Sequence, residues 1–188
     1  TRLRAWPDPS FFDSPTIPLP QLERLLRSKA LLLPGLQVSL TVEDGASSEW
    51  CFAKGMVQYL SEQLDAEMVA PVFSSEKYVA KGDETFPFGS GAAWAICWTA
   101  EGALARESYV NLIPTTAGGT HEAGLRQATL DAIRSFAEHH ALLPKGVKLA
   151  AEDVFARASF VLAVRMLDPS FQGQTKERLN SRDAVALV

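Results

Sequence analysis

The β-prone apolar run Ser159–Met166 constrains the fold of this chain more than any other feature. A short apolar run containing phenylalanine and valine is typical of a β-strand. It leads directly into the polar segment Asp168–Leu179, whose expected tip carries Gln174 and Lys176. A lysine ammonium is a compact charge suited to phosphate, and a glutamine amide can donate to a phosphate oxygen. The loop therefore predicts contact with a nucleotide phosphate at a site that another part of the protein builds.

Composition limits the class of protein. The chain has 188 residues, enough for one substantial core or two small ones, and its 47% apolar and 21% charged content is typical of a soluble globular domain. A net charge of −4 argues against a surface wholly devoted to nucleic acid, but it allows a local basic patch. No apolar run reaches membrane-spanning length. Cys51 and Cys97 lie in aromatic, apolar surroundings, so we expect buried core thiols in a reducing compartment, with a disulfide as the alternative.

The helical segments follow from apolar spacing and end signals. Residues 20–33 form an amphipathic pattern that begins at a proline, and residues 122–140 form a longer one. Gly118-Gly119-Thr120 precedes the long helix, with Thr120 as the expected N-cap and Glu122 as a first-turn acid. Shorter helices are expected at residues 56–64, at residues 151–158 and from about residue 183.

The strands are predicted by alternation and by turn signals. Residues 1–6 predict a half-buried strand, and residues 36–42 pair with residues 49–52 in a hairpin around Asp44-Gly45. Residues 91–99 and 106–113 are expected to pair as a second hairpin. Residues 65–90 predict irregular structure with room for one strand. The result is a mixed α/β chain.

Several residues allow both a functional and an ordinary interpretation. Gly118-Gly119-Thr120 can cradle an anion at a helix N-terminus, although a tight turn with a cap is favoured. Arg24, Arg27 and Lys29 fit either a DNA-lined cavity or a solvated helix face, and the solvated face is favoured. His121 is interpreted as a first-turn residue and not as a ligand.

Two further groups are interpreted as structural. The acid pair Glu152-Asp153 is typical of a helix-capping device and not of a metal site. Aromatic side chains in strand patterns favour core packing over base stacking; these are Trp50, Phe52, Trp94 and Trp98.

A set of motifs in a fixed order carries a family resemblance. They are Tyr109–Pro114, Gly118–His121, Gly124–Arg126, Leu143–Lys148, Ala151–Asp153 and Asp168–Leu179, with Trp6–Asp8, Phe11–Pro15 and Leu31–Gly35 before them. In these motifs the chain resembles the B subunits of bacterial type IIA DNA topoisomerases, the topoisomerase IV version more than the gyrase version. Each motif alone is weak, but together they span the chain.

The resemblance implies a domain organisation. In this family a GHKL ATPase domain is followed by a transducer domain, an α/β fold of the ribosomal protein S5 domain 2-like type with a mixed or antiparallel sheet packed with helices. Residues 1–15 would be the end of the ATPase domain, including its last strand, and residues 16–188 the transducer domain. We therefore expect a fragment of a longer protein, with the ATPase motifs before Thr1 and the metal-binding region after Val188.

The resemblance also implies a function. It predicts the B subunit of an ATP-dependent topoisomerase that couples ATP binding and hydrolysis to DNA strand passage, in decatenation, relaxation and chromosome segregation. Lys176 would be the catalytic residue, and Gln174 and Lys176 would contact the ATP γ-phosphate across the boundary with the upstream ATPase domain. ATP with Mg²⁺ is expected in the full-length protein, whereas this chain alone should bind neither, hold no metal and be inactive.

The implied partners are the topoisomerase A subunit, a second copy of the B subunit and double-stranded DNA. The implied location is the cytoplasm, in association with the nucleoid, and no membrane partner is expected. The alternative is a non-catalytic module of S5-like fold that binds nucleic acid or another protein.

Overall fold

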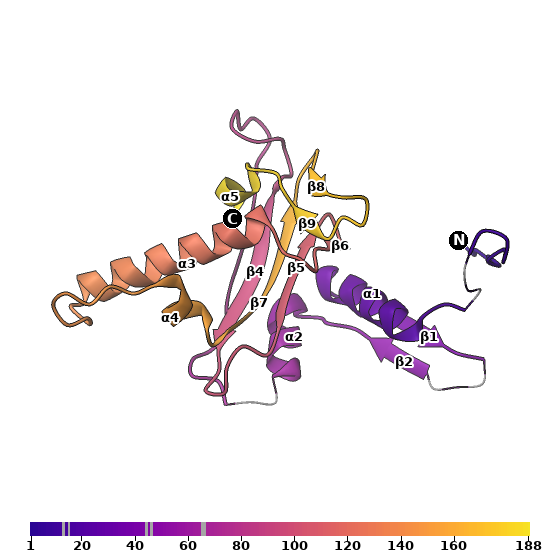
Figure 1. The fold of residues 1–188 in the computed structure, drawn as a ribbon, viewed down its shortest axis with the longest axis horizontal. Helices are drawn as coiled ribbons and strands as arrows, with labels where there is room; N and C mark the ends of the chain where they lie inside the picture. Colours follow the sequence, from indigo (N-terminus) through magenta and orange to yellow (C-terminus); the bar gives the residue numbers. More distant parts are fainter. Residues whose placement is uncertain (13, 15, 44, 46, 65–66) are drawn as a thin grey trace.

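The fold is centred on a five-stranded sheet in a computed structural model that describes residues 1–12, 14, 16–43, 45, 47–64 and 67–188 (Figure 1). The strands lie in the spatial order β3 (Phe73–Tyr78), β4 (Gly91–Trp98), β7 (Ala158–Arg165), β5 (Arg106–Val110) and β6 (Ile113–Pro114). All neighbouring strands are antiparallel except β5 and β7, which are parallel. The mixed α/β architecture expected from the sequence is confirmed.

Strand β7 is the centre of the sheet and separates β4 from β5. It pairs antiparallel with β4, where Gly91 lies opposite Arg165, and parallel with β5 on its other side. The predicted hairpin between residues 91–99 and 106–113 is therefore wrong. The physical reason is that the apolar β7 strand buries both of its faces and both of its edges only in a central position.

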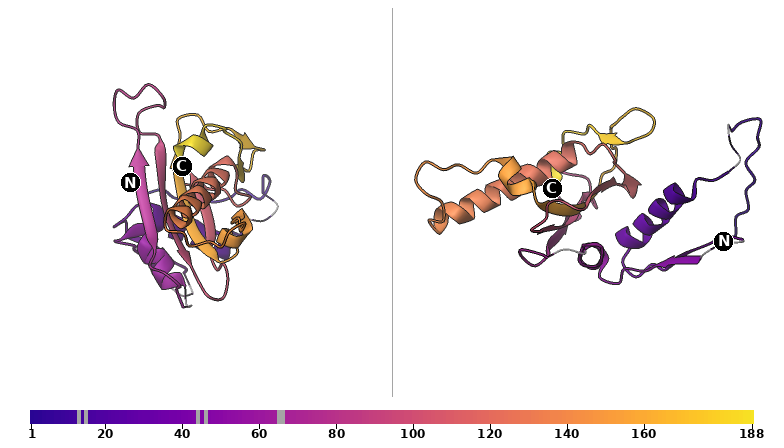
Figure 2. Two further views of the ribbon diagram at one scale, coloured as in Figure 1. Left: turned by 90° about the vertical axis from the view of Figure 1, so that its left-hand side faces the viewer. Right: turned by 60° about the horizontal axis from the view of Figure 1, so that its bottom comes forward.

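Helices cover both faces of the sheet, so the domain has three layers (Figure 2). One face packs against α3 (Thr120–His139), α4 (Ala151–Phe155) and α5 (Ala184–Leu187), and the other against α1 (Leu19–Leu32) and α2 (Gly55–Gln63). Alternate residues of β7 supply the two cores: Phe160 and Leu162 face the α3 layer, and Val161 faces the α1–α2 layer. This alternation follows from the two-residue period of a strand.

Helix α1 and the next two strands form an extension beside the β6 edge of the sheet (Figure 1). The hairpin of β1 (Val38–Thr41) and β2 (Ser47–Trp50) follows α1, with Val38 opposite Trp50. The predicted helix and the predicted hairpin are both confirmed, although Asp44 of the predicted turn lies outside the described residues.

The N-terminal residues differ from the prediction. Residues 1–8 contain no strand, and the side chains of Leu3 and Trp6 are 88% and 79% exposed. The predicted strand over residues 1–6 is therefore wrong, because a strand needs a hydrogen-bonded partner and no described residue pairs with this segment. The predicted domain boundary at residue 15 falls on a residue outside the described ones.

The remaining elements largely follow the prediction. The helix expected over residues 56–64 is α2, the long helix is α3, and β3 is the one strand for which residues 65–90 left room. Helix α4 is shorter than the predicted 151–158, because it ends at Phe155 and β7 begins at Ala158. The terminal helix begins at Ala184, with Asp183 as its N-cap.

The cysteines and tryptophans give mixed outcomes. Cys97 is fully buried as predicted. Cys51 is exposed, so its assignment to the core is wrong. Both thiols are free, which contradicts the disulfide alternative. The core-packing interpretation of the aromatic residues is confirmed, because Phe52 is buried and the partly buried tryptophans contact the two cores.

Candidate nucleotide-contacting loop

Gln174 and Lys176 lie on an exposed loop between two short strands, β8 (Phe171–Gln172) and β9 (Arg178–Leu179). Lys176 has a left-handed backbone with φ of 57°, and Gly173 opens the loop with φ of 75°. The Lys176 ammonium lies 5.8 Å from the centre of the Phe171 ring, within cation–π range. The structure therefore brings both predicted phosphate-contacting residues to one loop and leaves both side chains exposed.

The base of this loop is fixed to the turn before α3. The Leu179 amide donates to the Gly118 carbonyl at 3.0 Å, and the Ala117 amide donates to the Glu177 carbonyl at 2.9 Å. Gly119 also forms a parallel bridge with Leu179. We name residues 115–120 the seat of the loop, because their backbone forms hydrogen bonds with Glu177 and Leu179, which follow Lys176.

The N-terminus of α3 has no open anion site. Gly119 is the N-cap, and a Cβ added at Gly118 would lie 2.9 Å from the carboxylate of Glu122. A carboxylate at this position already complements the positive end of the helix dipole. The turn interpretation of the glycine pair is thereby supported. Thr120 as the N-cap is wrong, because Thr120 is the first helical residue and its hydroxyl donates to the Ser181 carbonyl.

Three buried polar side chains and the half-buried Glu122 form a hydrogen-bond chain next to the seat. Ser108 Oγ contacts Glu122 Oε1 at 2.6 Å and Thr115 Oγ1 at 2.7 Å, and Thr115 Oγ1 contacts His121 Nε2 at 3.0 Å. His121 lies in the first helical turn as predicted, but it is fully buried. Burial lowers the pKa of His121 from 6.5 to about 4, so the imidazole is neutral at physiological pH.

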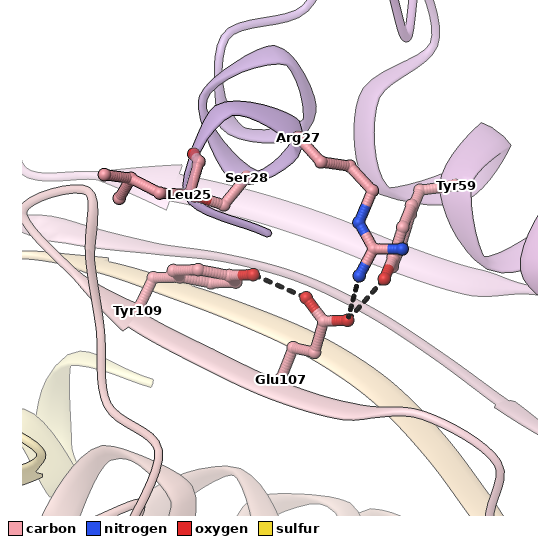
Figure 3. A network of polar contacts seen from close by, with 6 residues as sticks. All are labelled: Leu25, Arg27, Ser28, Tyr59, Glu107 and Tyr109. Atoms are coloured by element: carbon pink, nitrogen blue, oxygen red, sulfur yellow. Dashed lines mark hydrogen bonds and ion pairs between the residues drawn. The ribbon is translucent and has the colours of Figure 1, made fainter. Parts of the chain in front are cut away.

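A second polar cluster lies on the opposite face of β5 (Figure 3). The carboxylate of Glu107 accepts hydrogen bonds from the hydroxyls of Tyr59 on α2 and Tyr109 on β5. The guanidinium of Arg27 on α1 forms an ion pair with Glu107 at 3.8 Å and lies 5.5 Å from the centre of the Tyr59 ring. Burial, together with the Glu107 carboxylate, raises the pKa of both tyrosines. The cluster joins both helices of this layer to the sheet.

The three basic residues of α1 separate in the structure. Arg24 is exposed, whereas Arg27 is half-buried in the Glu107 cluster, and the Lys29 ammonium donates to the Leu112 carbonyl. Burial lowers the pKa of Lys29. The favoured interpretation as a solvated helix face is therefore wrong for Arg27 and Lys29, because each packs against the sheet layer. The capping interpretation of Asp153 is confirmed by its bond from the Ala150 amide at 2.7 Å.

Glu107, Ser108 and Thr115 have no distinct motif in the sequence. A polar residue in a strand usually faces solvent, so each has an ordinary interpretation. The available signal is alternation, because Glu107 and Ser108 immediately precede the apolar pair Tyr109-Val110 in one strand. When both faces of that strand are covered, both polar side chains must find partners inside the protein.

The described part of the chain contains neither a metal-binding cluster nor a membrane-spanning helix. Residues 1–12, 14, 16–43, 45, 47–64 and 67–188 contain no group of three or more histidine, cysteine or acidic residues placed to hold a metal ion. Among the helices of this described part, none is long and apolar enough to span a membrane.

Comparison with known proteins defines the class of this chain. A family model described as DNA gyrase B matches residues 54–188. Because the match covers well over half of the sequence, the chain belongs to the DNA gyrase B family. The resemblance found in the motifs is thereby confirmed at the level of the family.

Within that family the similar curated relatives are DNA topoisomerase 4 B subunits. The protein of Pseudomonas aeruginosa is 45% identical over 190 residues, and that of Salmonella typhimurium is 44% identical over 191 residues. Each alignment covers 100% of this chain and 29% of the relative. The chain therefore spans less than a third of the length of these relatives.

Solved structures agree with the fold. The topoisomerase IV ATP-binding domain of Francisella tularensis, solved with a small-molecule inhibitor, is 33% identical with a TM-score of 0.73; the match covers 96% of this chain and 47% of that one. The 43K ATPase domain of Thermus thermophilus gyrase B, solved with an aminocoumarin, is 21% identical with the same score and the same coverage. The second match is evidence for the fold alone.

Proposed function

We propose that this chain is the transducer part of the B subunit of an ATP-dependent type II DNA topoisomerase. Residues 16–188 would form an S5-like transducer domain, and residues 1–15 the end of the ATPase domain. The domain would transmit ATP binding and hydrolysis to DNA strand passage during decatenation and relaxation. Membership of the gyrase B family and the similarity to topoisomerase IV B subunits support this proposal.

The observation that carries the proposal is the geometry of the loop with Gln174 and Lys176. Both side chains are exposed, whereas the base of the loop is fixed by backbone hydrogen bonds to Gly118 and Ala117. A fixed base with a free cationic tip suits contact with an anion outside this domain. We assign that anion as the ATP γ-phosphate bound by the upstream ATPase domain.

The chemistry of the two side chains fits this assignment. Lys176 supplies a positive charge and Gln174 an amide N–H, which together stabilise the negative charge on a transferring phosphoryl group. ATP with Mg²⁺ would supply the phosphoryl group and its metal at the ATPase site. Lys176 would then report the presence of the γ-phosphate to this domain and contribute to its hydrolysis.

A solved structure described as the ATPase and transducer domains of DNA topoisomerase II from Balamuthia mandrillaris matches 87% of this chain with a TM-score of 0.58 and 22% identity. That likeness concerns the fold alone.

The proposed partners are the topoisomerase A subunit, a second B subunit and double-stranded DNA, and the proposed location is the cytoplasm, at the nucleoid.

The test is ATP hydrolysis by the full-length B subunit that contains this chain. Lys176→Ala should lower turnover about 100-fold, because a group that stabilises transition-state charge is lost. Gln174→Ala should lower it less, because an amide carries no net charge. Lys145→Ala is the matched control, because Lys145 is also exposed but lies beyond the far end of α3. Turnover of Lys176→Ala equal to that of Lys145→Ala would contradict the proposal.

A further inference from the structure

His121 is a buried histidine that the proposed role of Lys176 does not use. Its side chain is fully buried, and its Nδ1 atom is the one buried side-chain polar atom in the described part of the chain without a hydrogen-bond partner. An unpaired buried polar atom is costly, so a histidine here needs a compensating interaction. That interaction is the contact of its Nε2 with Thr115.

The direction of the hydrogen bonds around His121 follows from the inventory of donors. The Ser108 hydroxyl lies 2.6 Å from Glu122 Oε1 and 3.2 Å from the Thr115 carbonyl oxygen, so we assign its single proton to the closer carboxylate oxygen. Ser108 then accepts from Thr115, and Thr115 accepts from His121. Burial lowers the pKa of His121 to about 4, so the imidazole is neutral at physiological pH. With its one proton on Nε2, its Nδ1 is an unpaired acceptor and not an unpaired donor. The order His121–Thr115–Ser108–Glu122 forms one directed chain.

This chain fixes the seat of the loop to the central sheet. Ser108 belongs to β5, which pairs directly with the central strand β7, whereas the Thr115 carbonyl and amide lie in the seat itself. The Thr115 amide donates to the Ser108 carbonyl at 2.8 Å, and the Gly118 amide donates to the Thr115 carbonyl at 2.8 Å. His121 and Glu122 close the chain from the first turn of α3.

The base of the loop lies in close contact with this seat. A Cβ added at Gly119 would lie 2.3 Å from the Leu179 carbonyl oxygen, so the two backbones are in direct contact. The Thr120 hydroxyl also donates to the Ser181 carbonyl at 2.6 Å, beyond the loop. A displacement of the seat must therefore displace the base of the loop that carries Lys176.

We propose that the hydrogen-bond chain His121–Thr115–Ser108–Glu122 positions the loop of Gln174 and Lys176 for recognition of the terminal phosphate, with His121 and Thr115 as positioning residues. The inference rests on the proposed function of that loop. It adds a reason why a buried, neutral histidine lies at this turn. None of the four side chains contacts the nucleotide, and each acts through the position of the seat.

The alternative is that the hydrogen-bond chain His121–Thr115–Ser108–Glu122 only stabilises the fold. A purely structural role lowers the thermal stability but leaves the preference for a terminal phosphate unchanged. We therefore choose as readout the ratio of the dissociation constant of ADP to that of a non-hydrolysable ATP analogue, in the full-length B subunit. This ratio isolates the contribution of the γ-phosphate from the rest of nucleotide binding.

Two variants remove the bond between His121 and Thr115. Thr115→Val keeps the shape of the side chain without the hydroxyl, and His121→Leu removes the Nε2 donor. Both should lower the ratio about fivefold or more, because a small displacement of a phosphate-contacting group weakens its contact. His121→Gln offers an amide donor near the Nε2 position and should stay within about twofold of the wild type. If His121→Leu fails to fold, Thr115→Val decides.

Thr99→Val is the matched control for lost stability. Thr99 is fully buried and its hydroxyl donates to the Gly102 carbonyl, but it follows the Trp98 end of β4, opposite to the end of the sheet where β7 leads into the loop. This variant should lower the melting temperature without changing the ratio. If Thr115→Val also lowers the melting temperature without changing the ratio, the positioning role is excluded and the hydrogen-bond chain only stabilises the fold.

Lys176→Ala in the same assay separates the two proposals. If it leaves the ratio at the wild-type value, the phosphate-contacting function fails and the positioning role fails with it. If it lowers the ratio while Thr115→Val and His121→Leu do not, only the positioning role is overturned. The double variant Thr115→Val/Lys176→Ala should bind no more weakly than Lys176→Ala, because the two residues act as one unit. If the two substitutions instead weaken nucleotide binding multiplicatively, Thr115 and Lys176 do not act as one unit.

Discussion

Glu107 and Ser108 are adjacent on strand β5, and their side chains lead to opposite layers of the domain. Glu107 accepts bonds from the α1–α2 layer through Arg27 and Tyr59, whereas Ser108 bonds to Glu122 of α3. The period of two residues in a strand places such neighbours on opposite faces. A single strand thereby connects α1 with the seat of the exposed loop.

The Glu107 cluster should contribute to stability. Glu107→Ala leaves two tyrosine hydroxyls and the Arg27 guanidinium without their acceptor, so we expect a loss of about 1–2 kcal/mol in the free energy of unfolding. Urea denaturation monitored by circular dichroism measures it. Glu84→Ala is the control, because Glu84 is exposed. Equal midpoints for the two variants would show that the cluster adds nothing.

The buried His121 should make stability depend on pH. Its pKa is near 6.5 in the unfolded chain and about 4 in the folded one, so the unfolded state binds the proton first as the pH falls. The stabilisation is fully present above pH 6.5 and is lost as the pH falls through about 4, with a total of about 3 kcal/mol.

The measurement is the free energy of unfolding against pH for the wild type and for His121→Gln, which does not titrate. The wild-type curve should fall more steeply between pH 6.5 and 4. His139→Gln serves as the control for the substitution itself, because His139 is exposed. Parallel curves for the wild type and His121→Gln would refute the assignment.

Two glycines of the loop region should tolerate alanine very differently. Gly119 has φ of 144° and its added Cβ would meet the Leu179 oxygen at 2.3 Å, so Gly119→Ala should cost more than about 2 kcal/mol and detach the loop. Gly173 has φ of 75° with no atom within 4 Å, so Gly173→Ala should cost about 1 kcal/mol. Thermal unfolding compares them, and a reversed order would contradict the close contact.

The two cysteines should differ in reactivity. Cys51 is exposed, whereas Cys97 is fully buried and burial raises its pKa, which disfavours the reactive thiolate. A short pulse of iodoacetamide followed by peptide mass spectrometry should label Cys51 and leave Cys97 unmodified until denaturant is added. Labelling of Cys97 in the native protein would show that the β4–β7 core opens readily.

The local elements could be predicted because they depend on neighbouring residues. Helices α1 and α3 follow from apolar spacing and end signals, and the β1–β2 hairpin follows from alternation around a turn. The prediction failed where a strand needed a distant partner, as for residues 1–6, and where pairing skipped along the sequence, as for β4 and β5. The prediction that Cys51 is buried was wrong for the same reason. Aromatic neighbours in the sequence do not determine which face of a segment is covered by the rest of the protein.

The sequence by itself determined the membership of the family, the order of most helices and strands, and the placing of Gln174 and Lys176 on one glycine-containing loop. Motif order and local periodicity are sufficient for these properties. Only the tertiary structure decided that β7 separates β4 from β5, that the loop is seated on the turn before α3, and that His121 is buried in a directed hydrogen-bond chain. These features join residues far apart in the sequence, and no local pattern contains the packing that brings them together.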